Sequence, residues 1–326
     1  MNTCSRRSLG LSLLALSLVA ASSAPAEPPP VFLGKWGTSG SSDGKFTGPY
    51  KVAVDSSGNV FVVDHGLDRI QKFDEDGTFL TKWGSHGAGN GEFNDPYGVA
   101  VATSGHVYVA DANNYRIQKF NNSGGFLRKW GTSGPGDGQF NLPLDVAVDA
   151  SGNVYVADTS NHRIQKFDKD GNFLAKWGTP GGSDGAFSVP EGVAVDAMGS
   201  VYVADTANNR IQKFDSSGGF LAKWGSFGSD DGRFNKPVGV GVDAWGNVYV
   251  ADKLNNRIQK FTGDGTFLGK WGTFGTGDGE FDSPSGVAIA SSGLIYVADG
   301  HNERIQKFGG PWLGLFIGEP ELPGSQ

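Results

Sequence analysis

Side chains that could bind a ligand follow six prolines that stand 47 residues apart, from Pro49 to Pro284. The residue after each proline differs in chemical type from copy to copy, and these residues are Tyr50, Tyr97, Leu144, Glu191, Val238 and Ser285. Two copies also carry a charged residue at the next position, Lys51 and Asp145, where the other copies have Gly. Aromatic, apolar and charged groups gathered on one face are what a noncovalent binding site requires.

A second variable set lies later in each copy, in the loop between two extended runs. It consists of His65, Tyr115, His162, Lys253 and His301, with Asp68 and Glu303 in the same loops. Two alternatives stay open for the histidines: solvated loop side chains, or a metal site in which Asp68 or His86 joins His65 and His301. Asp145 and Glu191 could likewise share a cation. We expect both sets to bind a ligand noncovalently, with no cofactor, no resident metal ion and no catalytic residue.

Six pairs of charged residues, one in every copy, have the pattern of structural residues. Each copy contains Asp-x-x-x-x-Arg-Ile-Gln-Lys-Phe, and the pairs are Asp64/Arg69, Asp111/Arg116, Asp158/Arg163, Asp205/Arg210, Asp252/Arg257 and Asp299/Arg304. Perturbed functional groups cluster at one site, whereas these pairs are spread evenly over the repeats. We therefore predict that they are structural ion pairs.

The elements that position these residues are short strands. The third copy contains four extended runs, which are 146–149, 153–158, 163–167 and 173–177, and no segment has helical periodicity. Val, Ile, Tyr and Phe dominate the runs, and Ser151-Gly152 and Asp170-Gly171 separate them as hairpin turns. The first two runs are apolar at successive positions, which indicates strands covered on both faces. Six such copies predict an all-β fold, a six-bladed β-propeller with four antiparallel strands in each blade.

The two ends of the repeat region predict how the ring closes. Phe-Leu-x-Lys-Trp-Gly occurs six times, and its first copy, residues 32–37, precedes all the other repeat elements. We expect this N-terminal strand to complete the sixth blade. Residues 312–316 could form the same outer strand instead.

The repeat pattern resembles that of the NHL-repeat family of six-bladed β-propellers. The resemblance rests on Pro-x-Gly-Val-Ala-Val-Asp, Gly-Asn-Val-Tyr-Val-Ala-Asp and Asn-x-Arg-Ile-Gln-Lys-Phe, as in residues 143–167, and it covers residues 31 to about 308. The family includes interaction domains, extracellular sensor domains, RNA binders and a zinc-dependent amidating lyase, so the resemblance implies a binding or protein-interaction module more strongly than an enzyme. In that lyase, histidines after the repeat proline bind zinc, and none of the six equivalent residues here is His. A metal-dependent lyase or hydrolase remains the alternative.

The N-terminal 26 residues have the features of a cleavable signal peptide. Arg6 and Arg7 precede an uncharged stretch from Leu9 to Ala20, and residues 24–26, Ala-Pro-Ala, suit a cleavage site. We expect export by the general or the twin-arginine route, to the periplasm or the medium. The remaining segments are the propeller, 31–308, and a Gly/Pro-rich C-terminal tail, 309–326. Cys4 is the only cysteine, so the mature chain contains no thiol.

Charge narrows the range of partners. The chain of 326 residues has 27 basic and 34 acidic side chains, and removal of the leader lowers its net charge from -7 to -9. Nucleic acid is not expected as a partner, because binding to phosphates depends on a basic surface. No stretch outside the leader is apolar and long enough to span a bilayer. We expect a monomer that binds a protein, a peptide or a cell-envelope carbohydrate.

Overall fold

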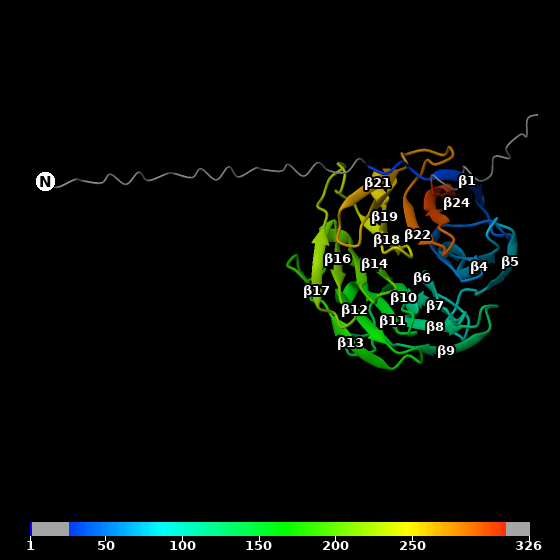
Figure 1. The fold of residues 1–326 in the computed structure, drawn as a ribbon. Coiled ribbons are helices and arrows are strands. Elements are labelled where there is room, and N and C mark those ends of the chain that lie inside the picture. The colour runs from blue at the N-terminus through cyan, green and yellow to red at the C-terminus, as the bar shows by residue number, and fades with distance from the viewer. Residues whose placement is uncertain (2–25, 311–326) are drawn as a thin grey trace, which may run out of the picture.

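Each 47-residue unit folds into one four-stranded antiparallel sheet, and six such sheets form a closed ring of blades (Figure 1). The structure is a computed structural model that describes residue 1 and residues 26–310. Residues 2–25 of the expected signal peptide, with Cys4, lie outside the described residues, as does the tail beyond residue 310, including residues 312–316. Within the described part of the chain, no helix is long and apolar enough to cross a membrane.

The first three blades follow the chain in order from their innermost to their outermost strand. The strands of blade 1 are β2 (Pro49–Val54), β3 (Val60–Asp64), β4 (Arg69–Phe73) and β5 (Phe79–Trp83). The strands of blade 2 are β6 (Pro96–Val101), β7 (Val107–Asp111), β8 (Arg116–Phe120) and β9 (Phe126–Trp130). The strands of blade 3 are β10 (Pro143–Val148), β11 (Val154–Asp158), β12 (Arg163–Phe167) and β13 (Phe173–Trp177).

The last three blades repeat this order, except that the N-terminal strand supplies the outer strand of blade 6. The strands of blade 4 are β14 (Pro190–Val195), β15 (Val201–Asp205), β16 (Arg210–Phe214) and β17 (Phe220–Trp224). The strands of blade 5 are β18 (Pro237–Val242), β19 (Val248–Asp252), β20 (Arg257–Phe261) and β21 (Phe267–Trp271). The strands of blade 6 are β22 (Pro284–Ile289), β23 (Ile295–Asp299), β24 (Arg304–Gly309) and β1 (Val31–Trp36).

The two faces of the ring differ in their connections. On the face that we call the mouth face, each innermost strand begins at its proline, and a short 3-10 helix joins the second and third strands. These helices are η1 (His65–Leu67), η2 (Ala112–Asn114), η3 (Thr159–Asn161), η4 (Thr206–Asn208), η5 (Lys253–Asn255) and η6 (Gly300–Asn302). The opposite face, which we call the turn face, carries the tight turns between the first and second strands and between the third and fourth strands. The two variable residue sets therefore lie on one face, the mouth face.

The fold confirms the predicted propeller but shifts three strand ends in the third unit. The inner strand begins at Pro143 and ends at Val148, and the next strand begins at Val154. Asp149 and Asn153 belong to the turn instead, because Oδ1 of Asp149 accepts hydrogen bonds from the backbone N–H groups of Ser151 and Asn153. A side-chain carboxylate that binds its own turn in this way replaces the ladder hydrogen bonds of a strand.

The N-terminal strand closes the ring, as the sequence predicted. β1 pairs antiparallel with β24, with Lys35 opposite Gln306 and Trp36 opposite Ile305. The chain just before β1 is also held, since the backbone N–H of Glu27 donates to the carbonyl oxygen of Leu268 (2.6 Å) and its carboxylate pairs with Lys260 (2.6 Å). Both ends of the repeat region therefore meet in blade 6.

The core lies between the blades. The described residues form six apolar clusters, and each combines side chains of two neighbouring blades. The repeat tryptophan of one blade packs on a turn of the next. For example, a Cβ on Gly171 would lie 2.6 Å from the ring of Trp130, so only glycine fits at that point. Close packing between neighbours explains why the Trp and the turn Gly recur together in the sequence.

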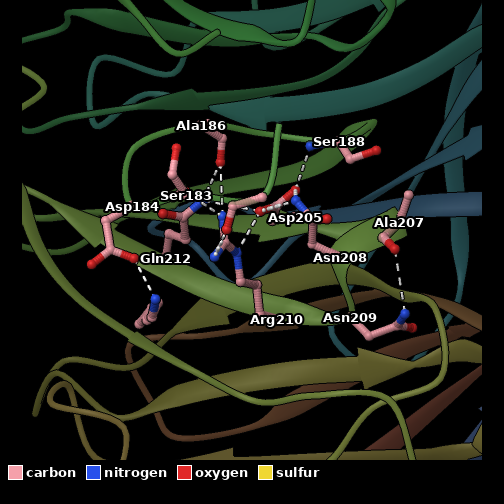
Figure 2. Close-up of polar contacts among 12 residues, drawn as sticks. Ser183, Asp184, Ala186, Ser188, Asp205, Ala207, Asn208, Asn209, Arg210 and Gln212 are labelled. Atoms are coloured by element: carbon pink, nitrogen blue, oxygen red, sulfur yellow. Dashed lines mark hydrogen bonds and ion pairs between the residues drawn. The ribbon is translucent and has the colours of Figure 1, made fainter. Parts of the chain in front are cut away.

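The six Asp/Arg pairs are structural ion pairs, as predicted. In each blade Nε of the arginine donates to Oδ2 of the aspartate over 2.6 to 2.7 Å. In blade 4, Asp205 also accepts from the backbone N–H of Ser188 (2.7 Å), while Arg210 donates to the carbonyl oxygens of Gly182, Ser183 and Ala186 (Figure 2). The pair thereby ties the connection that enters each blade to the second and third strands.

Candidate binding site at the channel mouth

The innermost strands come very close together where they begin. Gly98, Gly192, Gly239 and Gly286 occupy the second position after their prolines, and each faces the backbone of the next blade. A Cβ on Gly192 would lie 2.0 Å from the carbonyl oxygen of Val238, and one on Gly239 would lie 2.4 Å from that of Ser285. The mouth is therefore narrow, and glycine is required at these positions because any side chain would overlap the neighbouring strand.

Lys51 and Asp145, which replace this glycine in blades 1 and 3, form a buried ion pair across Gly98 of blade 2. Nζ of Lys51 lies 2.5 Å from Oδ2 of Asp145, and the two side chains are 8% and 1% exposed. Asp145 also accepts hydrogen bonds from the backbone N–H groups of Val146 and Val193 (2.9 Å each). Burial raises the pKa of Asp145, and the ammonium group of Lys51 opposes that rise.

The ion pair also defines the channel below the mouth. Lys51 lines a cavity of about 200 Å³ along the axis, whose other walls are Val, Ala, Ile and Gly residues of the six inner strands. The sequence left open a cation shared by Asp145 and Glu191, but the structure gives Asp145 the ammonium group of Lys51 as its partner. Lys51 and Asp145 thus brace the floor of the mouth.

Three aromatic rings pack above this floor. The rings of Tyr50 and Tyr97 lie perpendicular to each other with centroids 4.8 Å apart. The His65 ring lies 4.6 Å from Tyr97 and 6.4 Å from Tyr50, so blades 1 and 2 share one aromatic cluster. The two contacts of Tyr50 are edge-to-face, whereas the rings of His65 and Tyr97 are tilted by 31°. All three residues are partly exposed, so they can contact a ligand.

Charged groups from blades 4 and 5 complete the cluster. The hydroxyl of Tyr50 donates to Oε2 of Glu191 (3.1 Å), which reaches from the opposite side of the ring. Nζ of Lys253 lies 5.3 Å from the centroid of the Tyr50 ring, within the range of a cation–π interaction. We call the set of Tyr50, His65, Tyr97, Glu191 and Lys253 the mouth cluster.

The mouth cluster perturbs its ionisable groups. Burial raises the pKa of Glu191, and the hydrogen bond from Tyr50 and the charge of Lys253 oppose this rise. Burial lowers the pKa of Lys253, and the charge of Glu191 opposes this fall. Burial also raises the pKa of Tyr97, with a further rise from the charges of Asp95 and Glu191. Partly desolvated groups of opposite charge are a feature of sites that select a ligand by hydrogen bonds.

The histidines pair with separate carboxylates. Nδ1 of His65 lies 3.3 Å from Oδ1 of Asp95, but it is buried and makes no hydrogen bond in this geometry. Nδ1 of His301 lies 3.1 Å from Asp282, and Nδ1 of His86 lies 2.9 Å from Asp68. Among residues 26–310, no group of three His, Cys, Asp or Glu side chains could hold a metal ion. The structure thus does not bring His65, His301, Asp68 and His86 together as one ligand set.

The remaining residues of the two variable sets lie around the mouth cluster or below it. Val238 and Ser285 are buried, and Oγ of Ser285 donates to the carbonyl oxygen of Tyr50 (2.7 Å). Tyr115 packs against the core between blades 2 and 3, and Leu144 is partly exposed. Nδ1 of His162 accepts a hydrogen bond from the backbone N–H of Val189 (3.1 Å).

Sequence reasoning missed two charged residues beside the cluster, Asp95 and Lys236. Both precede a repeat proline, at a position that also varies among the copies: Gly48, Asp95, Leu142, Val189, Lys236 and Ser283. Comparison of the repeats at one further position would have found them. Asp95 lies beside His65, and Lys236 opposes the rise in the pKa of Glu191.

Together these features define a class of protein: a six-bladed β-propeller with a polar and aromatic cluster over a narrow channel mouth. The family model of the NHL repeat matches residues 93–120, 140–167, 187–214, 234–261 and 281–308. The chain therefore belongs to the NHL-repeat family, as its repeat pattern predicted. The first unit, equivalent to 46–73, is not among the matches, and it is the unit that supplies Tyr50, Lys51 and His65.

Solved structures with the same fold differ widely in sequence from this chain. A streptogramin B lyase is 16% identical with a TM-score of 0.59, covering 83% of this chain and 95% of its own. The virginiamycin B lyase of Staphylococcus aureus is 16% identical with a TM-score of 0.57, covering 81% and 95%. A Bacteroides thetaiotaomicron protein of unknown function is 18% identical with a TM-score of 0.65, covering 84% and 74%. No curated protein matches the sequence. At these identities the likeness shows the fold alone.

The Lys51–Asp145 pair predicts a pH-dependent loss of stability when the lysine is removed. In Lys51→Met the carboxyl group of Asp145 stays buried without its cation, so its pKa rises further above the ordinary value. The folded state then binds this proton more tightly than the unfolded state, and stability falls as the pH rises through the raised pKa. We expect a loss of about 3–5 kcal/mol at pH 7 and a smaller loss at pH 5, measured by urea denaturation.

The double variant Lys51→Gly/Asp145→Gly is the matched control, because it restores the glycine of the other four blades and removes both charges. It should not show the pH-dependent loss. A Lys51→Met variant as stable as the wild type at pH 7 would show that the pair does not support the mouth.

Proposed function

We propose that the protein is a noncovalent binding module that takes its ligand at the mouth face. The observation that carries the proposal is the mouth cluster, in which five side chains from four blades converge although the scaffold does not require them. The equivalent positions in other copies hold Leu144, Val238 or Ser285 without harm to the blade. A narrow channel mouth with three partly exposed aromatic residues favours a ligand that sits on this face.

The chemistry of the cluster suits a protein, a peptide or a cell-envelope carbohydrate. Tyr50, Tyr97 and His65 offer partly exposed aromatic surface to apolar side chains or to the C–H groups of a sugar. Glu191 and Lys253 can accept and donate hydrogen bonds to hydroxyl or amide groups. Lys236 and Asp95 add charges at the edge of the cluster, which would favour one orientation of the ligand.

Replacement of both tyrosines tests this proposal. Tyr50→Ala/Tyr97→Ala removes the stacking surface, so binding to an array of peptides and cell-envelope glycans should fall roughly tenfold or more. Circular dichroism should show an intact sheet fold, because the apolar clusters between the blades remain. The matched control is Leu221→Ala, an exposed apolar residue on the outer strand β17, which should retain mouth-face binding. Unchanged binding in the tyrosine variant would refute the site.

We also propose that the protein is exported, which rests on the charge and apolar pattern of residues 1–26. Cleavage after Ala26 would leave Glu27 as the first residue, directly before the strand that closes the ring. Mass spectrometry of the protein from the extracytoplasmic fraction should find a mature chain that begins at Glu27. Retention in the cytoplasm of a chain that still carries the leader would contradict this.

A metal-dependent lyase or hydrolase of the propeller type is the second candidate. Two observations favour it: the fold is that of the streptogramin B lyases, and His65 keeps a buried nitrogen without a hydrogen bond. The enzyme proposal requires stoichiometric metal in the purified protein, lost in His65→Ala, and turnover of a streptogramin B substrate. The binding proposal expects neither, and elemental analysis with a turnover assay distinguishes the two.

A further inference from the structure

Two large apolar side chains project from the turn face, at a position where the other blades have serine. The turn between the first and second strands carries Ser57, Ser104, Ser151 and Ser292 in four blades, but Met198 in blade 4 and Trp245 in blade 5. Met198 is 94% exposed and Trp245 is 77% exposed. Apolar groups of this size, exposed together on neighbouring blades, mark an interaction surface more often than a scaffold feature.

The turn itself does not need these side chains. The backbone N–H groups of Met198 and Trp245 donate to Oδ1 of Asp196 and Asp243 over 2.9 Å. Ser57 and Ser151 make the same contact, also over 2.9 Å, with Asp55 and Asp149. The conformation of the turn is therefore the same with serine, and the apolar side chains have no part in it.

The two side chains lie on equivalent turns of neighbouring blades, and the outer turns of blades 4 and 5 lie beside them. A Cβ on Gly199, next to Met198, would lie 3.5 Å from Cβ of Ser216, and one on Gly263 would lie 3.0 Å from the carbonyl oxygen of Gly246, next to Trp245. A groove of about 240 Å³ adjoins Met198, and its lining includes Asp149, Asn153, Lys166, Asp196 and Ser216. This groove lies between blades 3 and 4, on the Met198 side of the surface. We call the surface formed by Met198, Trp245 and the turns beside them the turn-face patch.

Exposed carboxylates flank the patch. Asp215 follows the third strand of blade 4 and Asp264 follows that of blade 5, and both side chains are exposed. Hydrogen bonds from the backbone N–H groups of Gly219 and Ser217 lower the pKa of Asp215, and a hydrogen bond from the hydroxyl of Thr262 lowers that of Asp264. Both groups are therefore ionised at neutral pH. Lys166 and Lys213 donate to the carbonyl oxygens of Ser216 and Gly263 in the same outer turns, so the carboxylates of Asp196, Asp215 and Asp264 outnumber the ammonium groups at the border of the patch.

We propose that this turn-face patch is a docking surface for a basic, apolar segment of another polypeptide. The apolar side chains of this segment would pack against Met198 and Trp245. Its Lys or Arg side chains would pair with Asp215, Asp264 and Asp196. Charge complementarity selects this partner over an anionic membrane, because the carboxylates would repel lipid phosphates. The surface lies on the opposite face from the mouth cluster, so it is independent of the proposed ligand site.

Intrinsic fluorescence tests the docking surface. The probe is a synthetic peptide of alternating Lys and Leu residues without tryptophan, titrated into the purified protein. Burial of Trp245 should shift its emission to shorter wavelengths, and the affinity should fall as salt is added. In Met198→Ser/Trp245→Ser, which restores the serine of the other four blades, calorimetry should show binding weakened at least about tenfold with an unchanged melting temperature.

Three controls decide between partners. The same peptide with Glu in place of Lys should bind at least about tenfold more weakly, and vesicles of phosphatidylglycerol should not bind. Tyr50→Ala/Tyr97→Ala should bind the Lys/Leu peptide as the wild type does, which separates this surface from the mouth face. Equal binding of the acidic peptide, binding of vesicles alone, no loss in the serine variant, or a dimer that the serine variant dissociates would each overturn the proposal.

Discussion

The buried contact between aspartate and arginine in each blade is the interaction on which the rest of the ring depends. Asp205 is fully buried, and an ionised carboxylate in that position is tolerated only because several donors surround it. Arg210, Gln212, Asn208 and the backbone of Ser188 supply those donors. Since one side of the contact is the connection entering the blade, the pair fixes each blade relative to the chain that reaches it from its neighbour.

This scaffold frees the mouth face for variation. The Asp/Arg pair, the repeat proline and the tryptophan that packs on the turn glycine are shared by every copy, and they stabilise the blade. The residues on either side of the proline are therefore not needed for its stability. Tyr50, Glu191 and Lys253 can therefore differ from their equivalents without loss of the fold. The first unit uses this freedom most, because it contributes Tyr50, Lys51 and His65 and departs from the family pattern.

Most of the fold could be predicted from the sequence, and only part of the site. The constant interval between prolines, the turn glycines and the early Phe-Leu-x-Lys-Trp-Gly copy predicted six blades and the closing strand. The contact of Tyr50 with Glu191 could not be predicted, because it joins opposite blades and depends on how narrow the mouth is. The same narrowness places Lys51 against Asp145, whereas the sequence alone had left open a cation shared by Asp145 and Glu191. The exposed Met198 and Trp245 were visible as departures from serine, but their meaning required the knowledge that the turn is unchanged.

The pairing of β1 with β24 has a consequence for the order of folding. Strands within a blade are close in sequence and can form hairpins early, whereas this pair joins the first and last strands of the ring. Contacts between residues so far apart in the chain are slow to form because loop-closure entropy opposes them. During synthesis, β1 must wait without its partner until the final repeat has emerged. The sixth blade is thus the last to assemble. Its completion converts a linear array of sheets into a closed ring, in which the first strand is paired with the last.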